Sequence, residues 1–206
     1  MPAEVVSTKG RQTRQAIELA ARKLFAERGF HGTTLADITS AAGKSPAVFY
    51  RYFTDKEDLL AALAESFLHD VVVPSRPNVR LPESPDDDVF FAAVVTGYWN
   101  MFKQNIGIMI AVAQLAATQQ RFAALQNEFR RFGMDIVAAS VRRAQEQGYG
   151  CDLHPDHTAA AIALLFENFT TVFVGRSGPE HLGLEISDAD AITTLSTVWK
   201  KTLYGS

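Results

Sequence analysis

Residues 43–57, GKSPAVFYRYFTDKE, contain the start of a short helix that follows a tight turn. Gly43 suits such a turn because glycine adopts backbone conformations that other residues avoid. Ser45 can cap the first free N–H groups of a helix, and Pro46 fits the first helical position, where its missing donor costs nothing. We therefore expect a new helix to begin at this point.

The two faces of this helix differ in chemistry. Phe49 and Phe53 are four residues apart, so they share one face, which we expect to pack inward. Ala47, Tyr50 and Arg51 fall on the other face, where a solvated helix would gain little from an aromatic ring. A helix that faces phosphates uses such groups as hydrogen-bond donors. The stretch therefore predicts a helix that lies against something outside the protein.

A second short helix precedes this one. Thr34 and Asp37 have the spacing of a capping box, and Leu35 and Ile38 then begin a buried stripe that Gly43 ends. Two short helices joined by a glycine turn, with aromatic and basic groups on the second, predict a helix-turn-helix unit.

A longer amphipathic helix is expected on each side of this unit. Apolar residues recur at helical spacing over residues 10–30 before it and over residues 55–73 after it. The later helix has a capping box of its own at Thr54 and Glu57.

The charge of the chain is divided unevenly. The whole chain has a formal net charge of -3, which argues against a protein coated by nucleic acid or bound to a membrane surface. Residues 9–56, however, hold nine lysines and arginines against four aspartates and glutamates, a balance of +5, so the remainder carries -8. Such a split is expected when one segment meets a polyanion and the other does not.

The rest of the chain predicts helices and no strand. Prolines interrupt residues 74–85, which we expect to form a loop, and a helix is then expected to open at Ser84 and Pro85. A capping box at Ser187 and Asp190 should start the last helix. The other expected helices cover residues 108–117, 121–147 and 159–175. The fold class is therefore predicted to be all-α, with about nine helices.

The sequence offers no candidate catalytic, metal or cofactor site. Cys151 is the single cysteine, and His154 and His157 are interpreted as the surface of a helix start. We therefore predict neither an enzyme nor a bound cofactor.

The start of the chain lacks a signal-peptide pattern, and no stretch of about 18 apolar residues was identified. A cytoplasmic location without membrane contact is expected.

Residues 25–60, FAERGFHGTTLADITSAAGKSPAVFYRYFTDKEDLL, resemble the DNA-binding head of TetR-type bacterial transcriptional regulators. This resemblance implies a helix-turn-helix domain over residues 1–60 and an effector-binding and dimerisation domain over residues 61–206. It also implies a homodimer in which a small molecule, bound among the C-terminal helices, alters the separation of two DNA-binding heads.

The resemblance also implies roles for individual residues. Tyr50 and Lys56 would each bind a phosphate, and Thr34 would anchor another at a helix N-terminus. Arg51 would read guanine or form a salt bridge. Some specificity would come from DNA shape or from Lys9 and Arg11 in a minor groove. The expected DNA-binding residues are Thr34, Lys44, Ser45, Pro46, Ala47, Tyr50, Arg51, Tyr52 and Lys56.

Effector and partner would meet the C-terminal helices. Helical spacing shows only that a side chain faces inward, so each predicted ligand residue also fits plain core. Glu167 should be cavity-lining, salt-bridged or at the subunit boundary, because an unpaired buried carboxylate is costly. The expected ligand-binding residues are Tyr98, Trp99, Phe102, Met109, Phe129, Met134, Phe166, Asn168 and Phe169, and the expected dimer residues are Leu164, Val172, Phe173, Leu195, Val198 and Trp199.

The predicted function is a ligand-responsive homodimeric regulator, in the first instance a repressor that binds a near-palindromic operator and is released by a small apolar effector. An apolar-ligand carrier or sensor that keeps the helix-turn-helix without repressing transcription is the alternative. A helical enzyme is disfavoured because no acid-base constellation is present.

Overall fold

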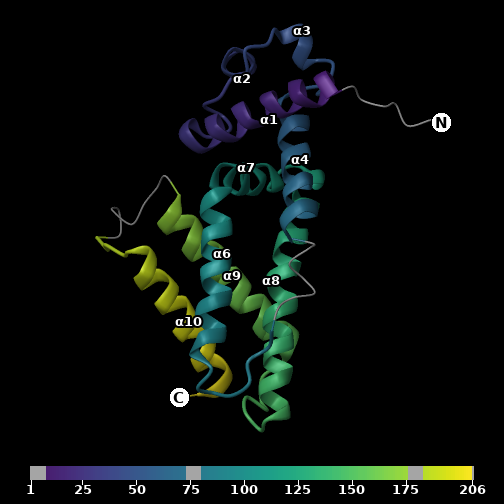
Figure 1. The fold of residues 1–206 in the computed structure, drawn as a ribbon. Helices are drawn as coiled ribbons and strands as arrows, with labels where there is room; N and C mark the ends of the chain where they lie inside the picture. Colours follow the sequence, from purple (N-terminus) through teal and green to yellow (C-terminus); the bar gives the residue numbers. More distant parts are fainter. Residues whose placement is uncertain (1–7, 73–79, 176–182, 206) are drawn as a thin grey trace, which may run out of the picture. The chain divides into compact units, whose positions relative to one another are not determined.

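The computed structural model describes residues 8–72, 80–175 and 183–205 (Figure 1). Within these ranges the chain forms nine α-helices, one π-helical segment and no strand, which confirms the predicted all-α class. The elements are α1 (Thr8–Arg28), α2 (Leu35–Ala41), α3 (Pro46–Phe49), α4 (Lys56–Phe67), η1 (Leu68–Val72), α6 (Asp88–Gln104), α7 (Ile106–Ala116), α8 (Gln120–Glu146), α9 (Pro155–Val174) and α10 (Asp188–Tyr204).

The chain divides into two compact units. The first, here called the head unit, consists of Met1–Phe67 and Gly107–Leu125. The second, the body unit, consists of Leu68–Ile106 and Gln126–Ser206. The head unit thus contains all of residues 1–60, the rest of α4, most of α7 and the first turn of α8. Two stretches far apart in sequence therefore share one compact unit.

The core of the head unit follows the expected periodicity. In α1 the buried residues Ile17, Ala21 and Leu24 recur at intervals of three and four, which places them on one face. Phe49 of α3 is fully buried, and its ring lies 5.5 Å from that of Phe53. The first three helices therefore close over a shared apolar centre, and α4 adds its buried leucines to the same unit.

Gly107, in the first turn of α7, fits closely against the backbone of α1. A Cβ atom placed on Gly107 would lie 2.5 Å from the backbone nitrogen of Ala26 and 2.6 Å from the carbonyl carbon of Phe25. Contacts this short do not occur between real atoms, and a backbone cannot swing aside as a side chain can. The close approach of α7 to α1 therefore requires glycine at this position.

The first turn of α8 is tied to α4 by polar contacts. Arg121 forms ion pairs with Asp58 at 3.4 Å and with Glu65 at 3.2 Å. Gln119, just before α8, donates a hydrogen bond to Glu57 at 3.0 Å. These contacts, together with Gly107, explain why residues 107–125 belong to the head unit.

Trp199 of α10 lies at the centre of the body core. Its ring packs edge-on against Phe90 and Phe91 of α6 and against Phe166 of α9. Its indole N–H donates to Ser140 Oγ of α8 at 3.2 Å. One side chain thus contacts the three other long helices of the body unit.

Two helix starts differ from the prediction. The helix expected from Asp55 begins at Lys56, and Asp55 caps it in place of Thr54: Asp58 N–H donates to Asp55 Oδ1 at 2.7 Å. The Asp58 carboxylate accepts from the Thr54 N–H at 3.1 Å, one residue before the cap, so the predicted box of Thr54 and Glu57 is replaced by bonds of Asp55 and Asp58.

The second difference concerns α6, which begins at Asp88 rather than at Pro85. Asp87 is its cap and accepts from the Phe90 N–H, while Arg80 pairs with the same carboxylate at 2.8 Å. The predicted boxes at Thr34 and Ser187 are confirmed. Part of the expected loop over residues 74–85, and the turn expected near residue 178, lie outside the described residues.

Helix α9 corrects the expectation that the chain has no apolar stretch of about 18 residues. By length and composition alone it is sufficient to cross a membrane. Core helices of globular proteins have the same properties, and α9 places Ile162 and Phe166 in the body core. Leu164 and Leu165, on its outer face, are each 43% exposed.

Replacing Gly107 by alanine should destabilise the protein by about 1–3 kcal/mol, because the added methyl group meets the α1 backbone. Urea unfolding followed by circular dichroism measures this change. Gly97→Ala is the matched control: Gly97 lies inside α6 with nothing within 4 Å of its added Cβ. That substitution should stabilise by about 0.5–1 kcal/mol. Equal changes in the free energy of unfolding for the two substitutions would contradict the close approach of α7 to α1.

Candidate nucleic-acid interface

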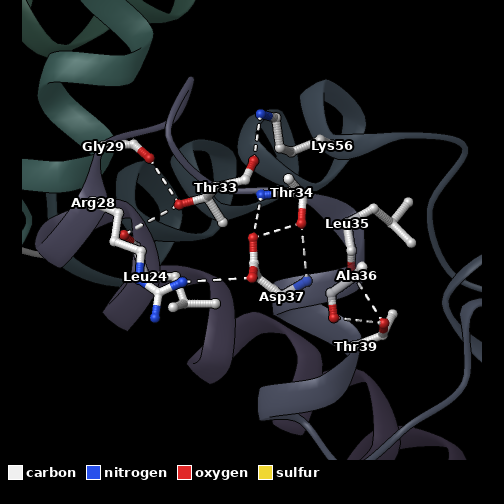
Figure 2. A network of polar contacts seen from close by, with 10 residues as sticks. All are labelled: Leu24, Arg28, Gly29, Thr33, Thr34, Leu35, Ala36, Asp37, Thr39 and Lys56. Atoms are coloured by element: carbon white, nitrogen blue, oxygen red, sulfur yellow. Dashed lines mark hydrogen bonds and ion pairs between the residues drawn. The ribbon is translucent and has the colours of Figure 1, made fainter.

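The N-terminus of α2 is fixed by a reciprocal capping box. Asp37 N–H donates to Thr34 Oγ1 at 3.1 Å, and Thr34 N–H donates to Asp37 Oδ2 at 2.8 Å (Figure 2). The Thr34 hydroxyl also donates to Asp37 Oδ2, and this bond, followed by that from the Thr34 N–H, lowers the pKa of the Asp37 carboxyl. The Arg28 guanidinium, 3.5 Å from Asp37, adds a smaller effect in the same direction. Helix α2 therefore starts at a defined residue and is held to the end of α1.

The turn between α2 and α3 has the geometry of a Schellman motif. Gly43 has a φ of +62°, in the left-handed region that favours glycine. Lys44 N–H donates to Thr39 O at 2.8 Å, and Gly43 N–H donates to Ser40 O at 3.0 Å. Helix α2 therefore ends at this turn, and α3 begins three residues after Gly43.

Helix α3 is shorter than predicted: it ends at Phe49, Tyr50 is its C-cap, and Arg51 and Phe53 lie in the segment that follows. The predicted division into buried and exposed side chains is nevertheless present. Phe49 and Phe53 are 0% and 3% exposed, whereas Tyr50 is 60% exposed. Ser45 precedes the helix but its side chain makes no capping bond, so that part of the expectation is wrong. The exposed members of the predicted DNA-binding set are Thr34, Ser45, Pro46, Ala47, Tyr50 and Arg51, and the half-buried members are Lys44, Tyr52 and Lys56.

Lys56 has a structural role that the sequence analysis did not anticipate. Its ammonium group donates to Phe30 O and Thr33 O, both at 2.7 Å, and lies 4.2 Å from the centre of the Phe30 ring. Partial burial lowers the pKa of Lys56, and neighbouring Glu57 opposes this effect. The side chain assigned to a phosphate is thus used inside the head, where it joins the start of α4 to the loop before α2.

The same loop is held from a second side. Thr33 Oγ1 donates to Gly29 O at 2.8 Å and lies 3.3 Å from Leu24 O, so the loop also contacts the end of α1 (Figure 2). Thr33 is only 1% exposed, which makes these bonds important, because buried polar groups are costly without a partner. The loop between α1 and α2, together with α1 and α4, therefore fixes the position of α2.

Seven of the basic side chains of the head fall into two groups. Arg14, Lys23 and Arg28 are paired with Glu18, Glu27 and Asp37. The described residues offer no ion pair or side-chain hydrogen bond to a second group, which consists of Lys9, Arg11, Lys44 and Arg51. Cations without a protein partner are the ones available for an external anion.

The residues predicted to bind a ligand are distributed over both units. Met109 belongs to the head unit, and the other eight belong to the body unit. Trp99, Phe102 and Phe166 are buried. Asn168 does not fit its expected role: it is exposed, and its side-chain amide donates to Leu164 O of its own helix at 2.9 Å.

The three options for Glu167 reduce to a salt bridge. Arg130 of α8 donates to its carboxylate through Nε at 2.6 Å and through a second nitrogen at 2.9 Å. Gln126 donates to it at 2.9 Å. Sequence reasoning missed both partners, because no local pattern indicates which residues of α8 face α9.

The residues predicted to form a dimer interface differ in how far their side chains are buried in one protomer. Leu195 and Trp199 are each 1% exposed and belong to the core of one protomer, so their surfaces are not available to a partner. Leu164 and Val198 are 43% and 37% exposed. Val172 and Phe173 are half-buried.

Comparison with known proteins agrees with this geometry. Residues 17–63 match the family model described as bacterial regulatory proteins, tetR family. The chain is 27% identical over 195 residues to the HTH-type transcriptional regulator UidR of Escherichia coli K12, covering 92% of this chain and 94% of that protein. It is 29% identical over 147 residues to the HTH-type transcriptional repressor KstR2 of Rhodococcus jostii RHA1, covering 68% and 71%.

Solved structures share the fold. A TetR transcription regulator from Haloarcula marismortui superposes with a TM-score of 0.69 at 20% identity, covering 94% of this chain and 99% of that one. The regulator FadR from Bacillus subtilis, solved in complex with stearoyl-CoA, gives a TM-score of 0.65 at 18% identity and covers 93% and 98%. The resemblance to TetR-type regulators is therefore confirmed.

Replacing Lys56 by methionine should lower the free energy of unfolding by about 1.5–3 kcal/mol, because the carbonyls of Phe30 and Thr33 lose a charged donor. Differential scanning calorimetry or urea unfolding checks this. Lys44→Met is the control, since Lys44 has no such partner, and its stability should stay within about 0.5 kcal/mol of the native value. Unchanged stability in Lys56→Met would show that the internal contacts are not important.

Proposed function

We propose that this TetR-type chain is a homodimeric, ligand-responsive transcriptional repressor that binds a near-palindromic operator and is released by a small, mainly apolar effector. The observation that carries this proposal is the outward face of the helix-turn-helix. Tyr50, the C-cap residue of α3, is exposed beside the fully buried Phe49, and Lys44 and Arg51 have no ion pair or side-chain hydrogen bond among the described residues.

The proposed contacts divide into positioning and reading. Tyr50, Lys44 and the exposed N-terminus of α2 at Thr34 would bind phosphates, which fix the register on DNA without reading its sequence. Arg51 would read a base edge, and the surface of Pro46 and Ala47 would meet a thymine methyl group. Lys56 donates to two carbonyls within the head, which leaves the third N–H of its ammonium group for a phosphate.

The proposed dimer uses the outer faces of α9 and α10. Leu164, Leu165 and Val198 are large apolar side chains that remain exposed on the protomer. Burying them against a two-fold partner would form a four-helix interface and place two heads on one operator. The cytoplasmic location and the absence of catalysis proposed for this chain accord with relatives that are transcriptional regulators.

Release by an effector requires a difference in affinity. A ligand shifts the protein away from the DNA-binding form only when it binds the other form more tightly. FadR from Bacillus subtilis has been solved with stearoyl-CoA, a molecule with a long apolar chain. A mainly apolar effector for this chain accords with the aromatic residues that line the inner sides of α6 and α9.

Tyr50→Phe should weaken binding to the DNA upstream of the chain's own coding region by about tenfold, the effect of losing one hydrogen bond to a phosphate. Because tyrosine carries no charge, the slope of log affinity against log salt should stay unchanged. Lys44→Ala should instead reduce that slope by about one. Fluorescence anisotropy over a salt series measures both.

Tyr149→Phe is the control for the first change, since Tyr149 is an exposed tyrosine of the body unit and should leave binding unaltered. If the native protein shows no specific binding, the proposed function is wrong. If Tyr50→Phe binds as tightly as Tyr149→Phe, the role of Tyr50 is wrong.

Leu164→Asp with Val198→Asp should convert the dimer to a monomer at micromolar concentration, because two desolvated charges oppose association by several kcal/mol. Light scattering coupled to size exclusion measures the mass. Val89→Asp, at an exposed position in the first turn of α6, should leave the dimer intact. A native monomer, or a dimer that persists in the double variant, would contradict the interface.

A further inference from the structure

The segment that carries Tyr50 and Arg51 ends at a hydrogen bond to a side chain. The N–H groups of residues 50–53 donate to backbone carbonyls within residues 46–49. The next N–H, that of Thr54, donates instead to Asp58 Oδ2 at 3.1 Å. Asp58 belongs to the first turn of α4, so its carboxylate joins the end of the exposed segment to the helix that follows.

The other oxygen of this carboxylate is bound from a distant part of the chain. Arg121, in the first turn of α8, places one nitrogen 3.4 Å from Asp58 Oδ1 and a second nitrogen 3.2 Å from Glu65. Asp58 and Glu65 are seven residues apart on α4, so they share one face, and the planar fork of a guanidinium can bind both. Arg121 therefore fixes the carboxylate that holds Thr54.

Asp58 is held in its ionised form by the same two contacts. The bond from the Thr54 N–H lowers the pKa of the Asp58 carboxyl most, burial opposes it, and the hydrogen bond and charge of Arg121 add to the lowering. An ionised carboxylate is a stronger acceptor than a neutral group. The backbone donor and the cation thus meet on one anionic acceptor, and each favours the position of the other.

The contribution of this network is local rather than global. The side chains of Arg121 and Glu65 are more than half exposed, and exposed ion pairs add little to the stability of a whole domain. The Thr54 N–H is at the surface, where water competes for it. A small contribution therefore decides how fully the segment is ordered, and affinity falls in proportion when the binding conformation is only partly populated.

We propose that Arg121 is a positioning residue for DNA binding: through Asp58 it holds the segment that carries Tyr50 and Arg51 in the conformation that meets DNA, without contacting the DNA itself. The inference rests on the proposed function and adds to it a residue outside the part of the chain that matches the family model.

Arg121→Gln should weaken binding to the DNA upstream of the coding region about two- to fivefold, the range expected for one exposed ion pair. Because no phosphate contact is lost, the slope of log affinity against log salt should stay unchanged. Arg131→Gln is the matched control: Arg131 lies on the same helix, is similarly exposed and pairs with Glu128 at 2.8 Å. It should bind as the native protein does. Fluorescence anisotropy over a salt series measures all three proteins.

A double-mutant cycle tests the route through Asp58. Asp58→Ala should weaken binding about two- to fivefold, although removing an acidic group ordinarily strengthens binding to a polyanion. Adding Arg121→Gln to Asp58→Ala should cause no further loss, because the carboxylate on which Arg121 acts is gone. Glu65→Gln removes only the other partner of Arg121 and should leave the affinity unchanged.

Melting temperatures separate positioning from general stability. Ser140→Ala removes the acceptor of the buried Trp199 N–H, so it should melt lower than the native protein, yet it should bind DNA with native affinity. If Ser140→Ala weakens binding as much as Arg121→Gln does, loss of stability alone accounts for the effect and the proposal is overturned.

Three other results would overturn it: an unchanged affinity in Arg121→Gln, a salt slope reduced by about one, which indicates a direct phosphate contact, or an equal loss from Arg121→Gln in the native and Asp58→Ala backgrounds. If the native protein binds the DNA specifically and one of these is found, the role of Arg121 is wrong and the proposed function stands. If the native protein shows no specific binding, the proposed function fails and this inference fails with it.

Discussion

The head depends on one ammonium group, that of Lys56, which lies between two backbone carbonyls and against an aromatic ring. The carbonyls belong to the loop between α1 and α2, and the lysine belongs to the first turn of α4. Three segments therefore meet at one cation, and the orientation of α2 and α3 follows from where that loop is held. A charged donor satisfies two carbonyls in a half-buried place at less cost than a deeply buried ion pair. The recognition face is thus positioned by contacts behind it, whereas Tyr50, Lys44 and Arg51 remain free in front.

Buried polar groups in both units are held by hydrogen bonds within the protomer. In the head, Thr33, Thr39 and the capping box at Thr34 leave no buried side-chain donor without a partner among the described residues. In the body, Ser140 accepts a hydrogen bond from the buried Trp199 N–H, and Arg130 and Gln126 bind Glu167. A unit that must present a fixed surface gains from such pairing, because an unpaired buried polar group is costly. The close approach of Gly107 to α1 joins part of the later sequence to the head, so that residues from beyond residue 100 help to form the DNA-binding unit.

Local patterns predicted the fold well, because capping, periodicity and glycine turns are properties of neighbouring residues. The boxes at Thr34 and Ser187, the turn at Gly43 and the inward face of Phe49 all follow from sequence spacing. The features that the sequence did not predict depend on partners far away in the chain. Lys56 appears free in sequence, yet the carbonyls that bind it lie more than twenty residues away. Trp199 was predicted to lie in the dimer interface, but its side chain is buried in the body core, where its indole N–H donates to Ser140. Asn168 is exposed and Thr170, two residues later on α9, is buried, and no local pattern in the sequence distinguishes the two positions.

The central claim is that the outward face of the helix-turn-helix binds DNA as one of a symmetric pair. Hydroxyl-radical footprinting on the DNA upstream of the coding region tests it most directly, because this cleavage reports contacts to each sugar and phosphate. Two protected patches related by a two-fold axis, with centres a whole number of helical turns apart, about 34 Å per turn, are the predicted result. A single patch without symmetry, or uniform protection along the fragment, would contradict the account.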